Sequence, residues 1–363
     1  MKITNRLLYS ELVKDLNSNT EKLFKLNSQI SSGKRINAPS DDPIGMASVL
    51  GYRTELNAFA QFQKAIDYSD GWLSRTDSIL QDMDDLLGRA SELAVQQSSG
   101  TATAQTREGA AEEIRQIREM ILGHANSKYG NKYLFGGTMT QSPPYLDVDV
   151  ENWQDDVSTL GAAPAAPSDG ERYISSTDGH IYAYNAASTS WADQGAPSEG
   201  TAVVVADQSE MYVFSDGQWK ALYQGNDSSF SVQIGKGDTV QTNIPGSEIF
   251  TNPEGNVVMT LMQLERALRN NDQGGISSEL SQIEASSKVI SDKLAKVGAT
   301  VNRLEHTKSV IERSDVDTQE RVSLIEDLDY ADAITSLQNQ QTIYQAALKS
   351  ASMITSLSLV DYI

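Results

Sequence analysis

Apolar residues recur every three or four positions near both ends of the chain. The repeating positions are, in the first segment, Tyr9, Leu12, Leu16, Asn19, Leu23, Leu26 and Ile30, and, in the last, Ile334, Leu337, Gln341, Tyr344, Leu348, Ala351 and Thr355. This spacing places one stripe on one side of a helix, and the stripe needs a partner helix. We expect the two terminal helices to pair with each other and with neighbouring subunits.

Local chemistry predicts where the first helices begin and end. The first helix should cover residues 4–32 and stop at Gly33, which suits a left-handed C-terminal turn. Asp42 followed by Pro43 is typical of a helix start, with a capping carboxylate and then proline in the first turn. A long helix should run from there toward Ser98, with a possible irregularity at Asp70-Gly71. Another is predicted over residues 103–128, after the Ser98-Ser99-Gly100 break.

Helical periodicity disappears between residue 129 and about 250. Short β-branched and aromatic runs alternate there with Gly, Asp, Asn and Ser, which predicts antiparallel strands. Hairpins are expected over 172–184 and 201–214, and a Pro/Ala linker over 162–167. Two Tyr/Trp-rich units end at Trp191 and Trp219, so 146–222 is predicted to be a separable β module.

Helical spacing returns at about Asn256, and a turn is expected over 270–275. The longest stripe then runs from Leu280 to Ile311. Neither half of this rod can bury its stripe alone, so the two halves should meet. We predict a mostly α fold with a β insert, a nested antiparallel coiled-coil rod from both halves of the chain, and an antiparallel β outer domain. The predicted domains are 1–40 plus 318–363 for polymerisation, 41–142 plus 246–317 for the rod, and 143–245 for the β-rich outer domain, with 162–222 separable.

Charge and composition narrow the function. The formal charge is −20 over 363 residues, which argues against nucleic acid and anionic membrane surfaces. The sequence contains no cysteine, so thiolate metal sites, thiol nucleophiles and disulfides are excluded. No run reaches the roughly 18 apolar residues of a membrane helix. The first residues lack the apolar core of a secretory signal peptide, so any export is expected to use another route.

Candidate chemistry is sparse. The spacing of His124, His180 and His306 suggests no Ser/His/Asp set, and we predict no enzyme, cofactor or metal. Asp147, Asp149 and Glu151 alternate as calcium ligands sometimes do, but they lack the glycine and terminal glutamate of an EF-hand loop. One alternative stays open for the insert: its aromatic residues form either the core of a small β module or a sugar-binding surface. These residues are Tyr182, Tyr184, Trp191, Tyr212 and Trp219.

Several motifs together resemble a known family. The segment Ser31–Asn37, followed by Pro39–Pro43, resembles the motif after the first helix of bacterial flagellin-like axial proteins. Residues 133–138 with 143–145, and residues 223–227 with 246–250, are similar to the outgoing and returning crossings of the flagellar hook-associated protein 3 family. Residues 325–333 and 358–363 resemble its C-terminal region. The resemblance covers about 1–145 and 223–363, and residues 162–222 depart from it.

This resemblance implies a structural protein of the hook–filament junction in the bacterial flagellum. It implies export by the flagellar type III apparatus, and as partners further copies of the chain, hook-associated protein 1, flagellin and an export chaperone. Flagellin itself and a fibre-like adhesin with a β head are the alternatives. The residues expected to take part in assembly are Leu12, Leu16, Leu23, Leu26, Ile30, Arg35, Asn37, Asp41, Asp42, Ile334, Leu337, Tyr344, Leu348, Leu357 and Leu359.

Two further expectations concern the assembly residues. The segment from Lys34 to Asp42 is interpreted as a capped interhelix loop, and contacts between subunits are a second role that we leave open. Single helices are marginal without partners, so the terminal helices are expected to fold when they dock.

Overall fold

The structure is a computed structural model that describes residues 2–146, 154, 156–208 and 210–360. For residues 2–6, 8, 9 and 354–360 it describes the backbone only. The chain forms two compact units, unit 1 with residues 1–63 and 308–363 and unit 2 with residues 64–307. The predicted division into three domains is a different partition, and it stays a prediction. None of the described helices is both long and apolar enough to cross a bilayer.

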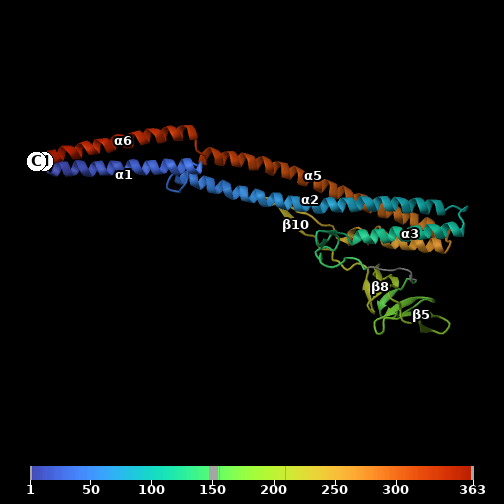
Figure 1. Ribbon diagram of the computed structural model, residues 1–363. Helices are drawn as coiled ribbons and strands as arrows, with labels where there is room; N and C mark the ends of the chain where they lie inside the picture. The colour runs from blue at the N-terminus through green and yellow to red at the C-terminus, as the bar shows by residue number, and fades with distance from the viewer. Residues whose placement is uncertain (1, 147–153, 155, 209, 361–363) are drawn as a thin grey trace. The chain divides into compact units, whose positions relative to one another are not determined.

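Unit 1 is built from helices at both ends of the chain. Helix α1 (Lys2–Ser32) lies beside α6 (Tyr330–Val360) (Figure 1). The unit also contains the first part of α2 (Pro43–Gln97) and the last part of α5 (Gln273–Glu326). The predicted helix over 4–32 and its stop are confirmed, because Gly33 has a φ of 71°, the left-handed conformation that glycine adopts readily.

The helices of unit 2 are the remainder of α2, α3 (Ala104–Ala125), α4 (Val257–Arg269) and the remainder of α5. Each start has its cap: Thr103 forms a capping box with Thr106, and the Asn256 side chain accepts from Met259 N. Along α5 one series of buried residues follows seven-residue steps, as the predicted stripe requires. It includes Ile283, Ile290, Val297 and Leu304.

Three expected features of the helices are wrong. Helix α2 is continuous through Asp70-Gly71. Gly71 instead makes room for the Tyr129 ring, whose Cζ would lie 2.9 Å from an added Cβ. The turn expected over 270–275 is shorter, since α5 already begins at Gln273. Helix α5 also runs past Thr318 to Glu326, so the last helix begins at Tyr330 rather than near Thr318.

Eleven short strands of unit 2 form four sheets in the described part of the chain. Two are hairpins, β1 (Lys128–Tyr129) with β2 (Lys132–Tyr133) and β10 (Ser231–Gly235) with β11 (Asp238–Gln241). The other two sheets make up the predicted β module. Their strands are β3 (Thr159–Gly161), β4 (Arg172–Ser175), β5 (Ile181–Asn185) and β6 (Ser190–Asp193) in one, and β7 (Ala202–Val205), β8 (Glu210–Ser215) and β9 (Gln218–Ala221) in the other.

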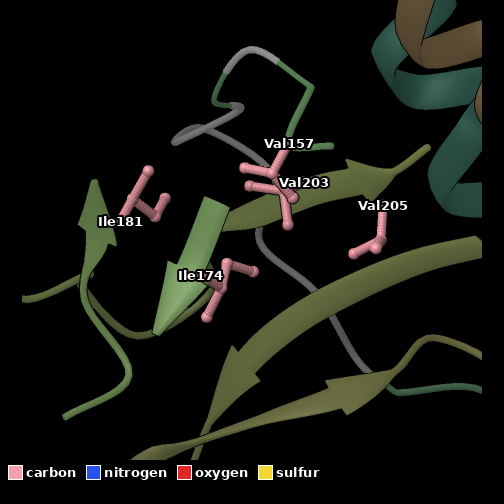
Figure 2. Packing of buried hydrophobic residues seen from close by; sticks show 5 residues of the cluster. All are labelled: Val157, Ile174, Ile181, Val203 and Val205. Carbon is pink, nitrogen blue, oxygen red and sulfur yellow. The ribbon is translucent and has the colours of Figure 1, made fainter. Parts of the chain in front are cut away.

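The core of the module lies between its two sheets. Ile174 and Ile181 from the four-stranded sheet face Val203 and Val205 from the three-stranded sheet, with Val157 beside them (Figure 2). Pairing within the module is antiparallel as expected, except that β3 runs parallel to β4. The predicted hairpins over 172–184 and 201–214 are confirmed.

The chain leaves and re-enters the helical part of unit 2 at one place. Tyr145 forms an isolated β-bridge with Tyr223, and Gly246 N donates to the Phe135 carbonyl at 2.8 Å. Phe135 and Phe250 pack edge to face with ring centroids 5.1 Å apart. The outgoing and returning motifs recognised in the sequence therefore pack against each other.

Candidate assembly site

The predicted stripe on α1 is the half-buried side of that helix. Its half-buried positions include Leu12, Leu16, Asn19, Leu23, Leu26 and Ile30. Because α1 contacts α6 along the pair, this is the side that meets α6. The two terminal helices thus pair within the chain, and the role of these residues in assembly stays a prediction.

On α6 the stripe that meets α1 agrees with the predicted one at Leu337, Tyr344 and Ala351, and it lies one residue earlier at the positions between them. The less exposed positions are Ala333, Leu337, Gln340, Tyr344, Ala347 and Ala351. Ile334 and Leu348 were expected in this stripe, but they are 45% and 44% exposed, and Gln341 is also exposed. Leu357 and Leu359 lie outside the residues whose side chains are described. The alanines allow α1 to approach closely, which leaves larger side chains on the outside.

A polar pair fixes the register of the two helices. Gln340 Nε2 donates to Asn19 Oδ1 at 2.9 Å between α6 and α1. Polar residues within an apolar seam specify alignment at some cost in stability. The partner of Asn19 is therefore Gln340, one residue before Gln341 of the predicted stripe.

The two helix breaks of unit 1 join at a feature that we call the elbow, residues 33–42 and 325–329. Arg35 N donates to the Glu326 carbonyl at 2.7 Å, and Leu328 N donates to the Gly33 carbonyl at 3.0 Å. These two bonds make Lys34 and Asp327 an antiparallel β-bridge. The loop after α1 is therefore fixed to the break between α5 and α6 by backbone hydrogen bonds.

Glu326 is the charged centre of the elbow. Its side chain is 6% exposed, with Lys34 Nζ 2.9 Å and Arg53 Nη2 2.7 Å from Oε1. Arg53 also reaches Oε2, so it binds both carboxylate oxygens. A carboxylate this buried needs such partners to remain charged. The sequence reasoning did not select Glu326, because nothing in its local pattern distinguishes it from other acids of α5.

The loop acids cap and brace the elbow. Asp42 Oδ1 accepts from Gly45 N at 2.9 Å and so caps α2, as predicted. Asp41 Oδ2 accepts from the backbone nitrogens of Asn37 and Ala38 at 3.1 and 3.0 Å, and Lys25 Nζ lies 2.9 Å from Oδ1. The hydrogen bond from Lys25 and those from the loop backbone lower the pKa of Asp41 below its ordinary value.

The remaining predicted loop residues also meet at the elbow. Arg35 Nη2 donates to the Ile325 carbonyl at 2.8 Å and lies 3.5 Å from Asp42 Oδ2. Asp329 was missed as a functional position: its side chain accepts from Ala331 N and Asp332 N and so caps α6. The sequence offered a signal, since an acid directly before Tyr330 begins a regular helical stretch.

Unit 1 fully buries few of its apolar side chains. Among the described residues, its buried hydrophobic side chains are only Ile36, Val49, Ile311 and Ala333, whereas the large majority of such residues lie in unit 2. Conversely, all but four of the exposed large hydrophobic side chains belong to unit 1. They include Ile44 at 82%, Val316 at 64%, Leu324 at 79% and Ile343 at 51%. A unit that holds so large a share of the exposed apolar side chains is a candidate for contacts with other proteins.

Among the described residues, the metal-ligating side chains and the histidines considered in the sequence do not gather into a site. They contain no group of three or more metal-ligating side chains. Asp147, Asp149 and Glu151 lie outside the described part of the chain. His180 contacts Asp193 at 3.0 Å on the β module, and His124 is half-buried on α3.

The fold defines a class of proteins in which both terminal regions form one helical pair and a β-rich region is inserted between the two halves. Two family models match the chain: the bacterial flagellin N-terminal helical region at residues 3–140, and the bacterial flagellin C-terminal helical region at residues 280–363. Together they cover more than half of the chain. The chain belongs to the bacterial flagellin family.

Curated relatives divide between two kinds of flagellar protein. Flagellar hook-associated protein 3 of Salmonella typhimurium is 27% identical over 146 residues, which cover 40% of this chain and 46% of that protein. The chain therefore matches less than half the length of that relative. A flagellin of Clostridium tyrobutyricum is 22% identical over an alignment that covers 96% of this chain and 97% of that flagellin.

Solved structures with the same fold include FlgL of Xanthomonas campestris, with a TM-score of 0.51, 15% identity, and coverage of 75% of this chain and 99% of that one. A Vibrio parahaemolyticus protein assigned to the flagellar hook-associated proteins has a TM-score of 0.54 at 17% identity, covering 79% of this chain and 99% of that one. At these identities the likeness supports the fold.

Proposed function

We propose that this chain is a structural subunit of the bacterial flagellum at the hook–filament junction. In this role it packs against further copies of itself and links hook-associated protein 1 to the flagellin filament. The hook-associated relatives support the location, and the flagellin family supports an axial subunit. Its work is assembly, so we assign it no catalytic residues and no cofactor.

One observation carries the proposal: unit 1 is a set of long helices that fully bury few of their apolar side chains and hold most of the exposed large apolar side chains of the described residues. A helical pair without a core is marginally stable alone, since most helix stability in proteins comes from packing an apolar face. Neighbouring subunits would supply that packing. Burying a large aliphatic side chain contributes about 1.5–3 kcal/mol, so a few outward residues per helix suffice to drive ordered assembly.

The exposed apolar side chains of α6 are the sharpest part of this surface. Ile334 and Leu348 lie along one flank of the α1 seam, and Ile343 lies on the opposite flank. The predicted assembly role of Ile334 and Leu348 is thus proposed for contacts between subunits, while Leu337 and Tyr344 serve the contact with α1. The elbow residues Arg35, Asn37, Asp41 and Asp42 hold the loop in shape for this surface.

A filament subunit is the second candidate function, because the Clostridium flagellin aligns with nearly the whole chain. The two candidates place the protein differently. A junction subunit would occupy one position between hook and filament, whereas a flagellin would occupy the length of the filament.

The test is deletion of the gene together with localisation of a tagged chain. We expect deletion cells to keep hooks, lack filaments and release flagellin into the medium. A small epitope inserted in the exposed loop at 162–167 should label a single position at the base of each filament. Label along the whole filament would assign the chain as a flagellin, and normal filaments in the deletion strain would contradict both candidates.

A further inference from the structure

The β module contains a tandem repeat. The segment 166–170, with sequence Ala-Pro-Ser-Asp-Gly, recurs thirty positions later as Ala-Pro-Ser-Glu-Gly at 196–200. The first repeat forms β4–β6 and the second forms β7–β9. Their hydrogen bonds correspond: Gly170 N donates to the Tyr184 carbonyl and Gly200 N to the Phe214 carbonyl, both at 2.9 Å.

Strand alternation gives each repeat an aromatic face and an aliphatic face. In the second repeat the aromatic face is covered by the first repeat. Tyr212 and Trp219 pack against the core that includes Ile174 and Ile181, and Trp219 Nε1 donates to the Gly179 carbonyl at 2.8 Å. Figure 2 shows the aliphatic residues Ile174 and Ile181 facing the second sheet. The aliphatic face of the first repeat is thus the partner of the aromatic face of the second.

The matching aromatic face of the first repeat points away from this core. Tyr173 precedes the core residue Ile174 and pairs across strands with Tyr182, while Tyr184 pairs with Trp191. Successive residues in a strand point to opposite sides, so these four rings share the outer face. The rings contact one another: Tyr173 stacks on Tyr182 at 5.4 Å and meets Trp191 edge to face at 4.7 Å. All four are half-exposed.

The uncovered aromatic face carries more hydroxyl groups than the covered one. Tyr173 stands where the second repeat has Val203, and Tyr184 stands where it has Phe214. Both changes add a hydroxyl to a position that in the second repeat packs against protein. A ring that carries a hydroxyl suits a ligand with apolar faces and hydrogen-bonding edges.

Carboxylates border the same rings. The Tyr182 hydroxyl donates to Asp178 at 2.8 Å, and Asp193 lies opposite Tyr182 in the sheet with His180 Nδ1 3.0 Å away. The hydrogen bond from His180 lowers the pKa of Asp193, so this acid stays negative at neutral pH. Negative acceptors at the border favour hydroxyl donors and repel anionic ligands.

We propose that Tyr173, Tyr182, Tyr184 and Trp191 form a platform that binds a neutral saccharide chain. Sugar rings would stack on the aromatic side chains, and their hydroxyls would donate to Asp178 and Asp193. This binding is independent of assembly at the hook–filament junction, since all of these residues belong to the inserted β module.

The test uses the full-length chain and soluble neutral oligosaccharides of glucose, N-acetylglucosamine and mannose, with polygalacturonate as the anionic comparison. Binding is measured by calorimetry and by quenching of tryptophan fluorescence. We expect at least one neutral oligosaccharide to bind and polygalacturonate not to bind. Trp191→Ala should weaken binding at least tenfold, and Trp191→Phe should restore most of it. Met120→Ala, which removes an exposed apolar side chain from α3, should change nothing.

Three results would overturn the proposal. One is the absence of binding to every neutral oligosaccharide at millimolar concentration, and another is binding that survives Trp191→Ala. The third is self-association of the chain that Trp191→Ala abolishes, which would make this face a contact between copies. Circular dichroism of Trp191→Ala and Tyr184→Ala shows whether each variant folds. A folded Tyr184→Ala chain must also lose binding, so the proposal does not depend on one variant.

Discussion

Glu326 is the residue on which the elbow depends most. It joins the end of α5 to both Lys34 and Arg53, and its carbonyl accepts from Arg35 N. The two cations are 41% and 43% exposed, so solvent weakens each ion pair. If the Glu326 charge is removed, the chain loses stability mainly because a poorly exposed side chain then no longer matches Lys34 and Arg53 as hydrogen-bonding partners.

Replacing Glu326 with Gln should therefore loosen the elbow locally. We expect a loss of about 1–2 kcal/mol, which makes hydrogen exchange at the Arg35 and Leu328 amides roughly tenfold faster. Exchange followed by mass spectrometry checks this, with Glu320→Gln on the exposed side of α5 as the control. Equal exchange in the two variants would show that the ion pairs do not support the elbow.

Asp41 contributes through its two loop hydrogen bonds and through Lys25. Because its pKa is lowered in the folded chain, its contribution is complete above the ordinary carboxyl range and is lost as the pH falls through the folded value. Asp41→Ala should cost about 1–2 kcal/mol near neutral pH. Asp41→Asn keeps an oxygen acceptor and should cost less.

Exchange of the Asn37 and Ala38 amides measures both Asp41 variants. An NMR titration of the Asp41 carboxyl in the wild-type chain shows whether its pKa is lowered or raised. A pKa at or above the ordinary aspartate value would contradict the assigned hydrogen bonds.

At the scale of elements, α6 carries apolar side chains outside its α1 seam as well as within it. The seam is rich in alanine, whereas the exposed residues Ile334 and Leu348 flank it on one side and Ile343 on the other. Hydropathy assigns the larger residues to the internal seam, which is why the prediction was wrong at Ile334 and Leu348. Ala333 and Ala347 are the less exposed residues instead, and the spacing along one helix does not distinguish the two choices.

Local chemistry predicted other elements well. Gly33, the Asp42-Pro43 start and the Thr103 and Asn256 starts depend on neighbouring residues only, and their structures agree with the sequence. The end of α5 was missed because the break at 327–329 is held by the distant loop at 33–35. The Glu326 cluster was missed for the same reason, since its two cations come from other elements.

Two glycines of α2 give a matched prediction. Gly88 is exposed with open space around its missing side chain, so Gly88→Ala should stabilise the chain by about 0.5–1 kcal/mol. At Gly71 the new methyl would collide with the Tyr129 ring. Gly71→Ala should therefore destabilise by about 1–3 kcal/mol.

Thermal unfolding distinguishes the two glycine variants, because the melting temperature should rise for Gly88→Ala and fall for Gly71→Ala. Stabilisation by Gly71→Ala would mean that Tyr129 does not occupy this space.

The terminal pair should order fully only when it docks. Since unit 1 has few buried apolar residues, amides over 4–32 and 334–360 of the isolated chain should exchange faster than those of α3 and α4. Hydrogen exchange on purified monomer measures the difference. Protection of the terminal helices equal to that of α3 and α4 would contradict folding on docking.

At the scale of the whole molecule, the chain separates two tasks. Unit 2 buries its own core and carries the β module, while unit 1 exposes apolar helices. The fold class and the nested order of elements were predictable, because they follow from heptad spacing and from the change to strand spacing near residue 129. The tandem repeat is visible in the sequence, but its uncovered aromatic face needed the strand register, which fixes the side of the sheet on which each ring lies.

Complementation of the deletion strain tests the central claim most directly. The variant carries Ile334→Gln, Ile343→Gln and Leu348→Gln, which remove exposed apolar side chains on both flanks of the α1 seam and leave the seam residues themselves unchanged. Met120→Ala is the matched control in unit 2. The account predicts that the triple variant folds and is exported, yet its cells have hooks without filaments, whereas control cells have normal filaments. Normal filament numbers with the triple variant would contradict assembly through this surface.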